Sequence, residues 1–266
     1  MDWISLLRAQ QADFILRVKK PKTYEVSLLE SQAKGCHSEM MAFWGETLGN
    51  MLEFAHQQSE AIARNPPPLP SDYPENTDWT IPFPQYFQHQ VEDYLLREQV
   101  VERVMWERLG KITKKVAVDA TSNMVLDEEG TLRGESKFPY SLTEEPNTKI
   151  QVLVADGESF NGIKKDKVKW SVTQEDLTHY QVLIFLCLFY PFSGQRGYEK
   201  QAVIAGFIPA HQLDFSEPVV SIYPSNLLYS GGLSWYLESL IANREIIPVD
   251  EIIIPEKIQT LPNNHP

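Results

Sequence analysis

Residues 115–140 read KVAVDATSNMVLDEEGTLRGESKFPY, and at this stretch the chain changes from helical to β patterning. The residues on either side of the DEEG turn are typical of strands and predict a β-hairpin, with strands at 115–125 and 131–140. In both strands the even positions hold most of the bulky apolar side chains, while the odd positions are mostly polar. Because side chains alternate between the faces of a sheet, one face of this hairpin is expected to be buried and the other polar.

The register of the hairpin decides which polar residues meet. If both apolar sets share one core, residues of equal parity lie opposite each other, and Asp119 then shares a face with Glu135 and Lys137. This register needs a loop of odd length, such as a G1-bulge hairpin with Gly130 in the left-handed conformation. A four-residue loop gives the other parity and puts Asp119 on the far side. Burial favours the first register, because a slip exposes side chains such as Val118 at a cost of about 1.5–3 kcal/mol each.

Two carboxylates and a lysine on one sheet face suit metal-assisted phosphodiester hydrolysis. Asp119 and Glu135 would supply the oxygen ligands that Mg²⁺ prefers, together with water and a phosphate oxygen. The metal would lower the pKa of a bound water and offset charge on the scissile phosphate. Lys137 would position or deprotonate the attacking water. The same three residues also fit an ordinary solvated sheet face, so both interpretations stay open here.

The rest of the chain separates into a helical part and a β-rich part. Apolar spacing predicts helices at 2–19, 37–64 and 86–109, and a proline-rich connector occupies 65–84. Residues 1–110 are therefore interpreted as a helical region and 111–266 as an α/β core. Helices followed by a mainly antiparallel sheet predict the α+β (mixed α/β) class.

Within the second part, strands and helices alternate in a recognisable order. Further strands are expected at 149–155, 167–172 and 201–208, and the apolar run 181–190 is expected to be a buried strand or a core helix. The segment VVSIY follows from 219, and a last helix is expected at 233–243. A short helix is expected to start near Thr173, because Asp176 follows three residues later as a variant of the capping box.

Composition bounds the protein class. The chain has 266 residues and a net charge of −12, which argues against a general nucleic-acid coat protein but still allows a local cationic groove. One lysine cluster exists in GIKKDKVKW, formed by Lys164, Lys165, Lys167 and Lys169, and a solvated turn explains it more simply. Two distant cysteines and the absence of a signal-like start predict a reducing, cytoplasmic location. The longest apolar run, Val182–Tyr190, is less than half a membrane span, so no membrane association is expected.

The pattern D-x(15)-E-x-K, formed by Asp119, Glu135 and Lys137 and followed by Phe-Pro-Tyr, resembles the PD-(D/E)xK nuclease superfamily, which has the restriction-endonuclease-like fold. The segment 167–213 is similar to small restriction-like nuclease domains, in which a catalytic strand leads to a helix and then to an apolar core strand. The resemblance covers about residues 113–213. It implies a mixed sheet flanked by helices and a Mg²⁺- or Mn²⁺-dependent nuclease acting on nucleic acid, DNA in the first instance. A homodimer is compatible with it, since many restriction-like enzymes pair to cut both strands.

An alternative alignment takes Ile150–Leu153 as the catalytic strand. It places Gln151 at the acidic position and Leu153 at the lysine position, which implies an inactive nuclease fold retained as a binding or assembly module, for example in a defence or mobile-element complex. Asp127–Gly130 and Gly134 agree with this alignment, because the small restriction-like nuclease domains often have D-x-x-G and a second glycine before the catalytic strand. A third interpretation is an α+β protein unrelated to nucleases.

Other candidate residues are weaker. Glu39 stands near the start of the second expected helix, where it resembles a metal-ligating glutamate of related exonucleases, although the helix dipole alone favours an acid there. The six histidines have no zinc-ligand spacing, and His179 is interpreted as a helix-end residue.

Overall fold

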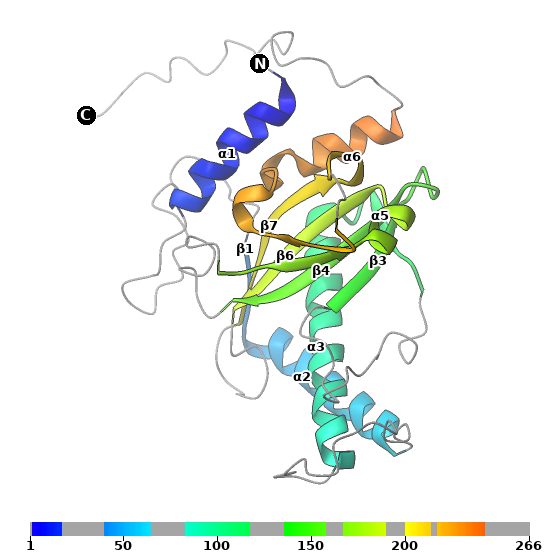
Figure 1. Ribbon diagram of the computed structural model, residues 1–266. Coiled ribbons are helices and arrows are strands. Elements are labelled where there is room, and N and C mark those ends of the chain that lie inside the picture. Colours follow the sequence, from blue (N-terminus) through cyan, green and yellow to red (C-terminus); the bar gives the residue numbers. More distant parts are fainter. Residues whose placement is uncertain are drawn as a thin grey trace, which may run out of the picture.

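A computed structural model describes the protein over residues 2–17, 40–64, 83–117, 136–157, 167–189, 200–213 and 217–242. Its centre is a six-stranded sheet with the strand order β1-β7-β6-β4-β3-β2 (Figure 1). Strands β4 and β6 are parallel, and every other neighbouring pair in this sheet is antiparallel. A smaller sheet pairs β5 with β8. The expected α+β class, a mixed sheet flanked by helices with a helix at the N-terminus, is confirmed.

The elements of the described residues have the following bounds. The helices are α1 (Trp3–Arg17), α2 (Gly45–Ala63), α3 (Phe83–Leu109), α5 (Gln174–His179) and α6 (Leu233–Ile241). The strands are β1 (Met40–Phe43), β2 (Thr113–Lys115), β3 (Ser136–Leu142), β4 (Lys149–Gly157), β5 (Trp170–Thr173), β6 (Val182–Phe189), β7 (Lys200–Pro209) and β8 (Val219–Ile222). Short 3-10 turns are η2 (Ala210–Gln212), η3 (Pro224–Asn226) and η4 (Ser230–Gly232). Among these helices, none combines the length and the apolar character needed to cross a membrane.

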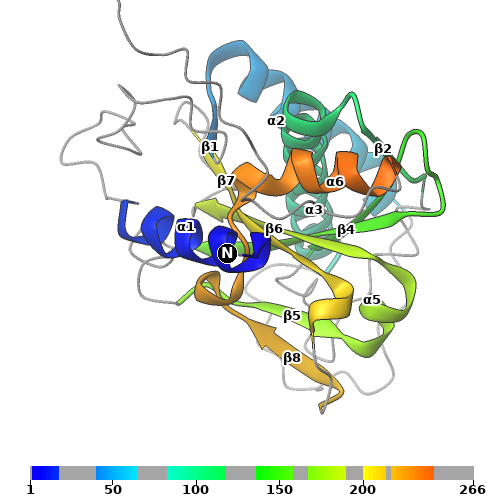
Figure 2. The same ribbon diagram turned by 90° about the horizontal axis from the view of Figure 1, so that it is seen from above.

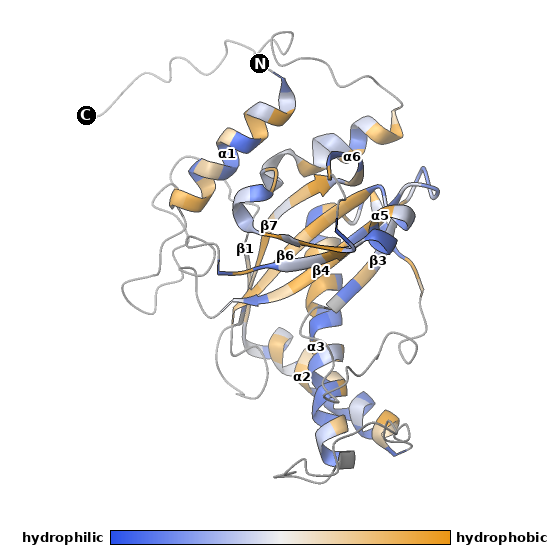
Figure 3. Cartoon of the chain, in the orientation of Figure 1, coloured by the Kyte–Doolittle hydropathy of each residue, from blue (hydrophilic) through white to orange (hydrophobic). Residues whose placement is uncertain are grey.

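Two layers cover the six-stranded sheet. Helices α2, α3 and α6 pack on one face, and α5 with the β5–β8 sheet lies on the other (Figure 2). Along β4 the alternation is strict: Ile150 and Val152 belong to the core under α2 and α3, whereas Leu153 and Ala155 belong to the core under β5 and β8. Because both faces are covered, β4 and β6 are almost entirely buried, and the middle of the sheet is the most hydrophobic part of the fold (Figure 3).

The second expected helix, 37–64, is wrong at its start. Residues Met40–Phe43 form the edge strand β1, which pairs antiparallel with β7, and α2 begins only at Gly45. Gly45 has a φ of 57°, a left-handed conformation that glycine adopts without steric cost, and the chain turns at this residue from the strand into the helix. The apolar residues MMAF suit both a helix and a strand, so only their pairing with β7 decides between the two.

The helical and β-rich parts of the chain share one sheet and one core. Strand β1 comes from the region before residue 110 and pairs with β7 from the region after it. The larger hydrophobic cluster likewise joins Met51 of α2 and Val100 of α3 to Phe138 of β3 and Ile184 of β6. Of the proposed connector 65–84, residues 83 and 84 belong to α3, and the remainder lies outside the described residues.

Candidate functional site

Of the three predicted site residues, the structure describes one. Asp119 and Glu135, the predicted metal ligands, lie outside the described residues, and so does Glu39. Lys137 is the second residue of β3 and pairs in the backbone register with Leu153 of β4. Phe138 and Tyr140 lie in the core under α3. Lys137 therefore points to the opposite face of the sheet, which is covered by α5.

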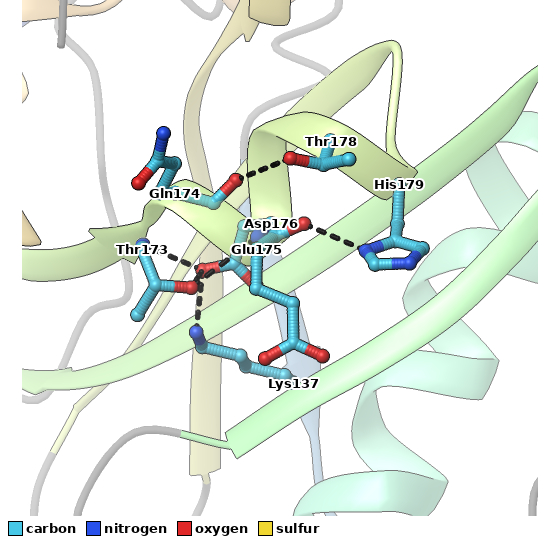
Figure 4. Close-up of polar contacts among 7 residues, drawn as sticks. All are labelled: Lys137, Thr173, Gln174, Glu175, Asp176, Thr178 and His179. Carbon is cyan, nitrogen blue, oxygen red and sulfur yellow. Dashed lines mark hydrogen bonds and ion pairs between the residues drawn. The ribbon is translucent and has the colours of Figure 1, made fainter. Parts of the chain in front are cut away.

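The ammonium group of Lys137 contacts a carboxylate that the sequence analysis assigned only to helix capping. Its Nζ donates to Oδ2 of Asp176 at 2.5 Å (Figure 4). The Asp176 side chain is 8 % exposed and that of Lys137 is 32 % exposed, so the pair lies partly beneath the protein surface. The cation is thus held by a buried acid on a neighbouring element.

Asp176 is positioned by the start of α5. Its Oδ2 accepts hydrogen bonds from the backbone N of Thr173 at 2.8 Å and from Thr173 Oγ1 at 2.9 Å. In return, the Asp176 backbone N donates to Thr173 Oγ1 at 3.2 Å, which completes the expected capping box. One carboxylate oxygen therefore serves both the end of a helix and the lysine of β3.

The remaining side chains drawn around this pair stabilise the same short helix. Thr178 Oγ1 donates to the Gln174 carbonyl at 2.9 Å, and His179 Nδ1 lies 2.9 Å from the Glu175 carbonyl (Figure 4). His179 is exposed at the end of α5, as the sequence analysis proposed. These contacts lie within one helix, so they give His179 a local structural role.

The register expected for the hairpin is wrong where the structure describes both strands. Lys115 lies opposite Tyr140, and Val116 N donates to the Pro139 carbonyl at 3.0 Å, so residues of unequal parity face each other. Lys115 therefore shares the face of Tyr140. Placing Asp119 on the face of Lys137 would need a further shift of register beyond Val116.

In this register Lys115 forms two ion pairs with α3. Lys115 Nζ lies 3.1 Å from Glu98 Oε1 and 3.0 Å from Glu102 Oε2, both on the helix that covers this face. Val116, which the burial argument placed in the core, is 38 % exposed instead. Strand β2 is at the edge of the sheet, so burial constrains its register less than it constrains that of an inner strand.

The alternative catalytic strand, Ile150–Leu153, lies in the middle of the sheet. Gln151 is 3 % exposed and Leu153 is completely buried, and both belong to the face of Lys137. Within the described part of the chain, Gln151 Oε1 accepts no hydrogen bond. Strand β4 is followed by β5, by α5 and then by β6, which lies parallel to it and is apolar throughout.

The side-chain oxygen atoms described on this face do not fit the ligand set of a divalent metal ion. Mg²⁺ and Mn²⁺ need several oxygen ligands. Asp176 Oδ2 already accepts from Lys137 and Thr173, and Gln151 adds only one neutral amide oxygen. Over the described ranges, no group of three or more His, Cys, Asp or Glu side chains is placed to hold a metal. The metal predicted at Asp119 and Glu135 therefore depends on residues that the structure does not describe.

A second polar cluster joins α3 to the end of β4 and was missed by the sequence analysis. Arg97 Nε donates to Asp93 Oδ2 at 2.7 Å, and Arg97 Nη2 donates to Asp156 Oδ2 at 2.6 Å. Burial alone would lower the pKa of the guanidinium, but the two carboxylates outweigh it and raise that pKa. The spacing of Asp93 and Arg97 by four residues on a helix was a readable signal. Asp156 belongs to β4, and nothing in the spacing of the sequence pointed to its contact with Arg97.

The lysine cluster in GIKKDKVKW gives no described cationic groove. Lys167 and Lys169 are exposed just before β5, and Lys164 and Lys165 lie outside the described residues. The described pair agrees with a solvated segment.

Comparisons with known proteins found no matching family model, no matching curated protein and no matching solved structure.

Proposed function

We propose that this protein is a catalytically inactive relative of restriction-endonuclease-like nucleases that acts as a binding or assembly module. One observation supports the proposal above the others. In the resembling family a catalytic strand leads to a helix and then to an apolar core strand, and here β4 leads through β5 to α5 and then to β6. At the positions of the motif β4 has Gln151 and Leu153, in place of an acid and a lysine.

The chemistry of these two side chains supports the absence of catalysis. A leucine offers neither charge nor a proton, and Leu153 is fully buried. The neutral amide of Gln151 cannot supply the negative charge with which a carboxylate holds a hard cation. The nearest described cation on this face, Lys137, is paired with Asp176, and this pairing restrains it from reaching a substrate phosphate.

The competing proposal is an active Mg²⁺-dependent nuclease with Asp119, Glu135 and Lys137 as catalytic residues. It requires two residues outside the described ranges to converge on Lys137, and it requires Lys137 to leave Asp176. The described register of β2 and β3 disfavours the first requirement.

A cleavage assay separates these two proposals. The full chain is incubated with linear and plasmid DNA and with RNA, in the presence of Mg²⁺ or Mn²⁺. The expected result is no cleavage above that of a Lys137→Ala preparation. Lys114→Ala is the matched control, because Lys114 is an exposed lysine on the adjacent strand. Cleavage by the wild type and by Lys114→Ala, but not by Lys137→Ala, would overturn the inactive assignment.

For the binding role, the charge and the surface favour a protein partner over nucleic acid. The net charge of −12 repels phosphates. Trp44 precedes α2 and is 65 % exposed, and Trp106 near the end of α3 is 67 % exposed. The two helices are antiparallel, with Gln99 Nε2 donating to the Met51 carbonyl at 2.9 Å, so both tryptophans belong to one end of the helix pair. Tryptophan is enriched in protein interfaces.

Partner class can be measured with the purified chain. Fluorescence anisotropy with a labelled DNA duplex is expected to show weak binding that disappears at moderate salt. Light scattering across a concentration series tests for a homodimer, which Trp44→Ala with Trp106→Ala should dissociate. A salt-resistant complex with DNA together with a strictly monomeric protein would contradict a protein-binding role.

A further inference from the structure

A polar cavity lies between α1, the end of β7 and β8, on the sheet face that also carries α5, and its lining residues include neither Lys137 nor Asp176. Its volume is about 400 Å³, and α1, β8, η2 and η3 all contribute lining residues. Small-molecule sites in proteins commonly have volumes of about 300–1,000 Å³. The cavity is therefore large enough for a metabolite-sized ligand.

The charge of this cavity differs from that of the protein. Arg8 of α1 is its only charged lining residue, and no acidic side chain is among the described residues that line it. The whole chain, by contrast, has a net charge of −12. Arg8 is exposed, and its guanidinium forms no ion pair with the other described residues. A single cation matches a single negative charge.

A neutral donor reinforces this preference. Gln212 of η2 also lines the cavity, and its Nε2 is buried without a hydrogen-bond partner in the described part of the chain. A buried amide N–H without a partner costs about 1–3 kcal/mol, which an acceptor in the cavity would recover. The amide oxygen of Asn226, another lining residue, accepts from Tyr223 N at 2.8 Å, which leaves its nitrogen as the free donor end.

The rest of the wall is apolar. Ile208 and Ile222 are almost fully buried, and Leu213 and Val220 are partly buried beside them. Aliphatic side chains of this kind contact hydrocarbon, and they give no hydrogen bonds to a sugar or a base. The cavity thus combines donors for an anionic group with a surface for a short alkyl chain.

The helix that presents Arg8 is firmly anchored. One turn further along α1, Gln11 is 1 % exposed and donates through Nε2 to the carbonyls of Ala205 and Pro224, each at 2.9 Å. These bonds tie α1 to β7 and to η3, two elements of the same wall. The backbone of α1 at Arg8 is thereby fixed beside the cavity before any ligand binds, and the exposed Arg8 side chain extends from this anchored helix.

We propose that this cavity binds a small monocarboxylate, with the carboxylate on Arg8 and Gln212 and a short alkyl chain against Ile208, Leu213, Val220 and Ile222. A dianion such as phosphate would leave one charge uncompensated in an acidic protein and fits less well. The site is independent of the proposed inactivity of β4, so either proposal stands or fails alone.

Hexanoate is the probe for this site. Titration of the isotope-labelled full chain, followed by amide NMR shifts, is expected to give saturable changes at β8 and η3 with a dissociation constant of about 1 mM. Arg8→Ala should weaken binding about tenfold or more, and hexan-1-ol, which lacks the charge, should bind about tenfold more weakly than hexanoate. Gln212→Leu should weaken hexanoate binding by a smaller factor.

The matched control is Arg103→Ala, which removes an exposed arginine on α3, far from this cavity. It should bind hexanoate like the wild type. Equal affinity of wild type and Arg8→Ala, equal affinity for hexanoate and hexan-1-ol, or tighter binding of inorganic phosphate than of hexanoate would each overturn the assignment.

Discussion

Replacing Asp176 by alanine removes the single carboxylate that serves both the α5 cap and Lys137. Loss of the capping box costs about 1 kcal/mol, as for other acidic or hydroxyl caps. Loss of the pair with Lys137 adds about 1 kcal/mol, because the lysine side chain is 32 % exposed and regains water when its partner is removed. We therefore expect Asp176→Ala to lower the free energy of unfolding by about 2 kcal/mol, which corresponds to a fall in Tm of about 4–8 °C.

Urea unfolding measures this loss directly. Trp170 is fully buried in β5, four residues before the first residue of α5, and it is one of six tryptophans whose combined fluorescence reports on unfolding of the chain. The control is Glu175→Ala, which removes an exposed acid from the same helical turn and should cost about 0.5 kcal/mol or less. A cycle with Lys137→Ala should give a coupling energy of about 1 kcal/mol between the two side chains. If Asp176→Ala unfolded at the same urea concentration as Glu175→Ala, the shared role of this carboxylate would be refuted.

Three further outcomes are expected from other parts of the fold. Gly206 has a φ of 155° and an added Cβ would lie 2.5 Å from the Leu228 carbonyl oxygen, so Gly206→Ala should destabilise the protein by about 2 kcal/mol or more, as measured by chemical unfolding. Burial raises the pKa of Tyr236 from 10.0 to about 12, so the unfolded chain loses the phenolic proton at a lower pH than the folded protein does. The free energy of unfolding should therefore fall as the pH rises across this range. Thermal melts should show a smaller fall for Tyr236→Phe. Arg97→Met should cost about 2 kcal/mol by removing the link to Asp156, and a melt unchanged from wild type would contradict a stabilising role for that pair.

Much of the second half of the fold was predictable because its signals are local. The apolar run from Val182 is a strand, and the capping pair Thr173 and Asp176 begins a short helix where expected. Predictions failed where a segment suited two kinds of secondary structure equally well. Residues Met40–Phe43 suit a helix or a strand, and their pairing with β7 settles the matter.

The candidate site shows the same division. Spacing singled out Lys137, and the alternative alignment singled out Gln151 and Leu153, because both are matters of residue type along one strand. The partner of Lys137 was not predictable, since Asp176 is 39 residues further along the chain and belongs to another element. Pairings of this kind depend on which elements pack together, and spacing along the chain does not contain that information.

From the order of its residues alone, this chain specifies helices followed by a buried mixed sheet, because the apolar periodicity of each segment is strong enough to choose its own structure. The faces on which charged residues meet were decided only by tertiary packing. Lys115 lies on the face of α3, where it pairs with Glu98 and Glu102, and the register of this sheet edge departs from the parity of its apolar residues. Long-range ion pairs and strand register arise from contacts between distant segments, so they exist only in the folded protein.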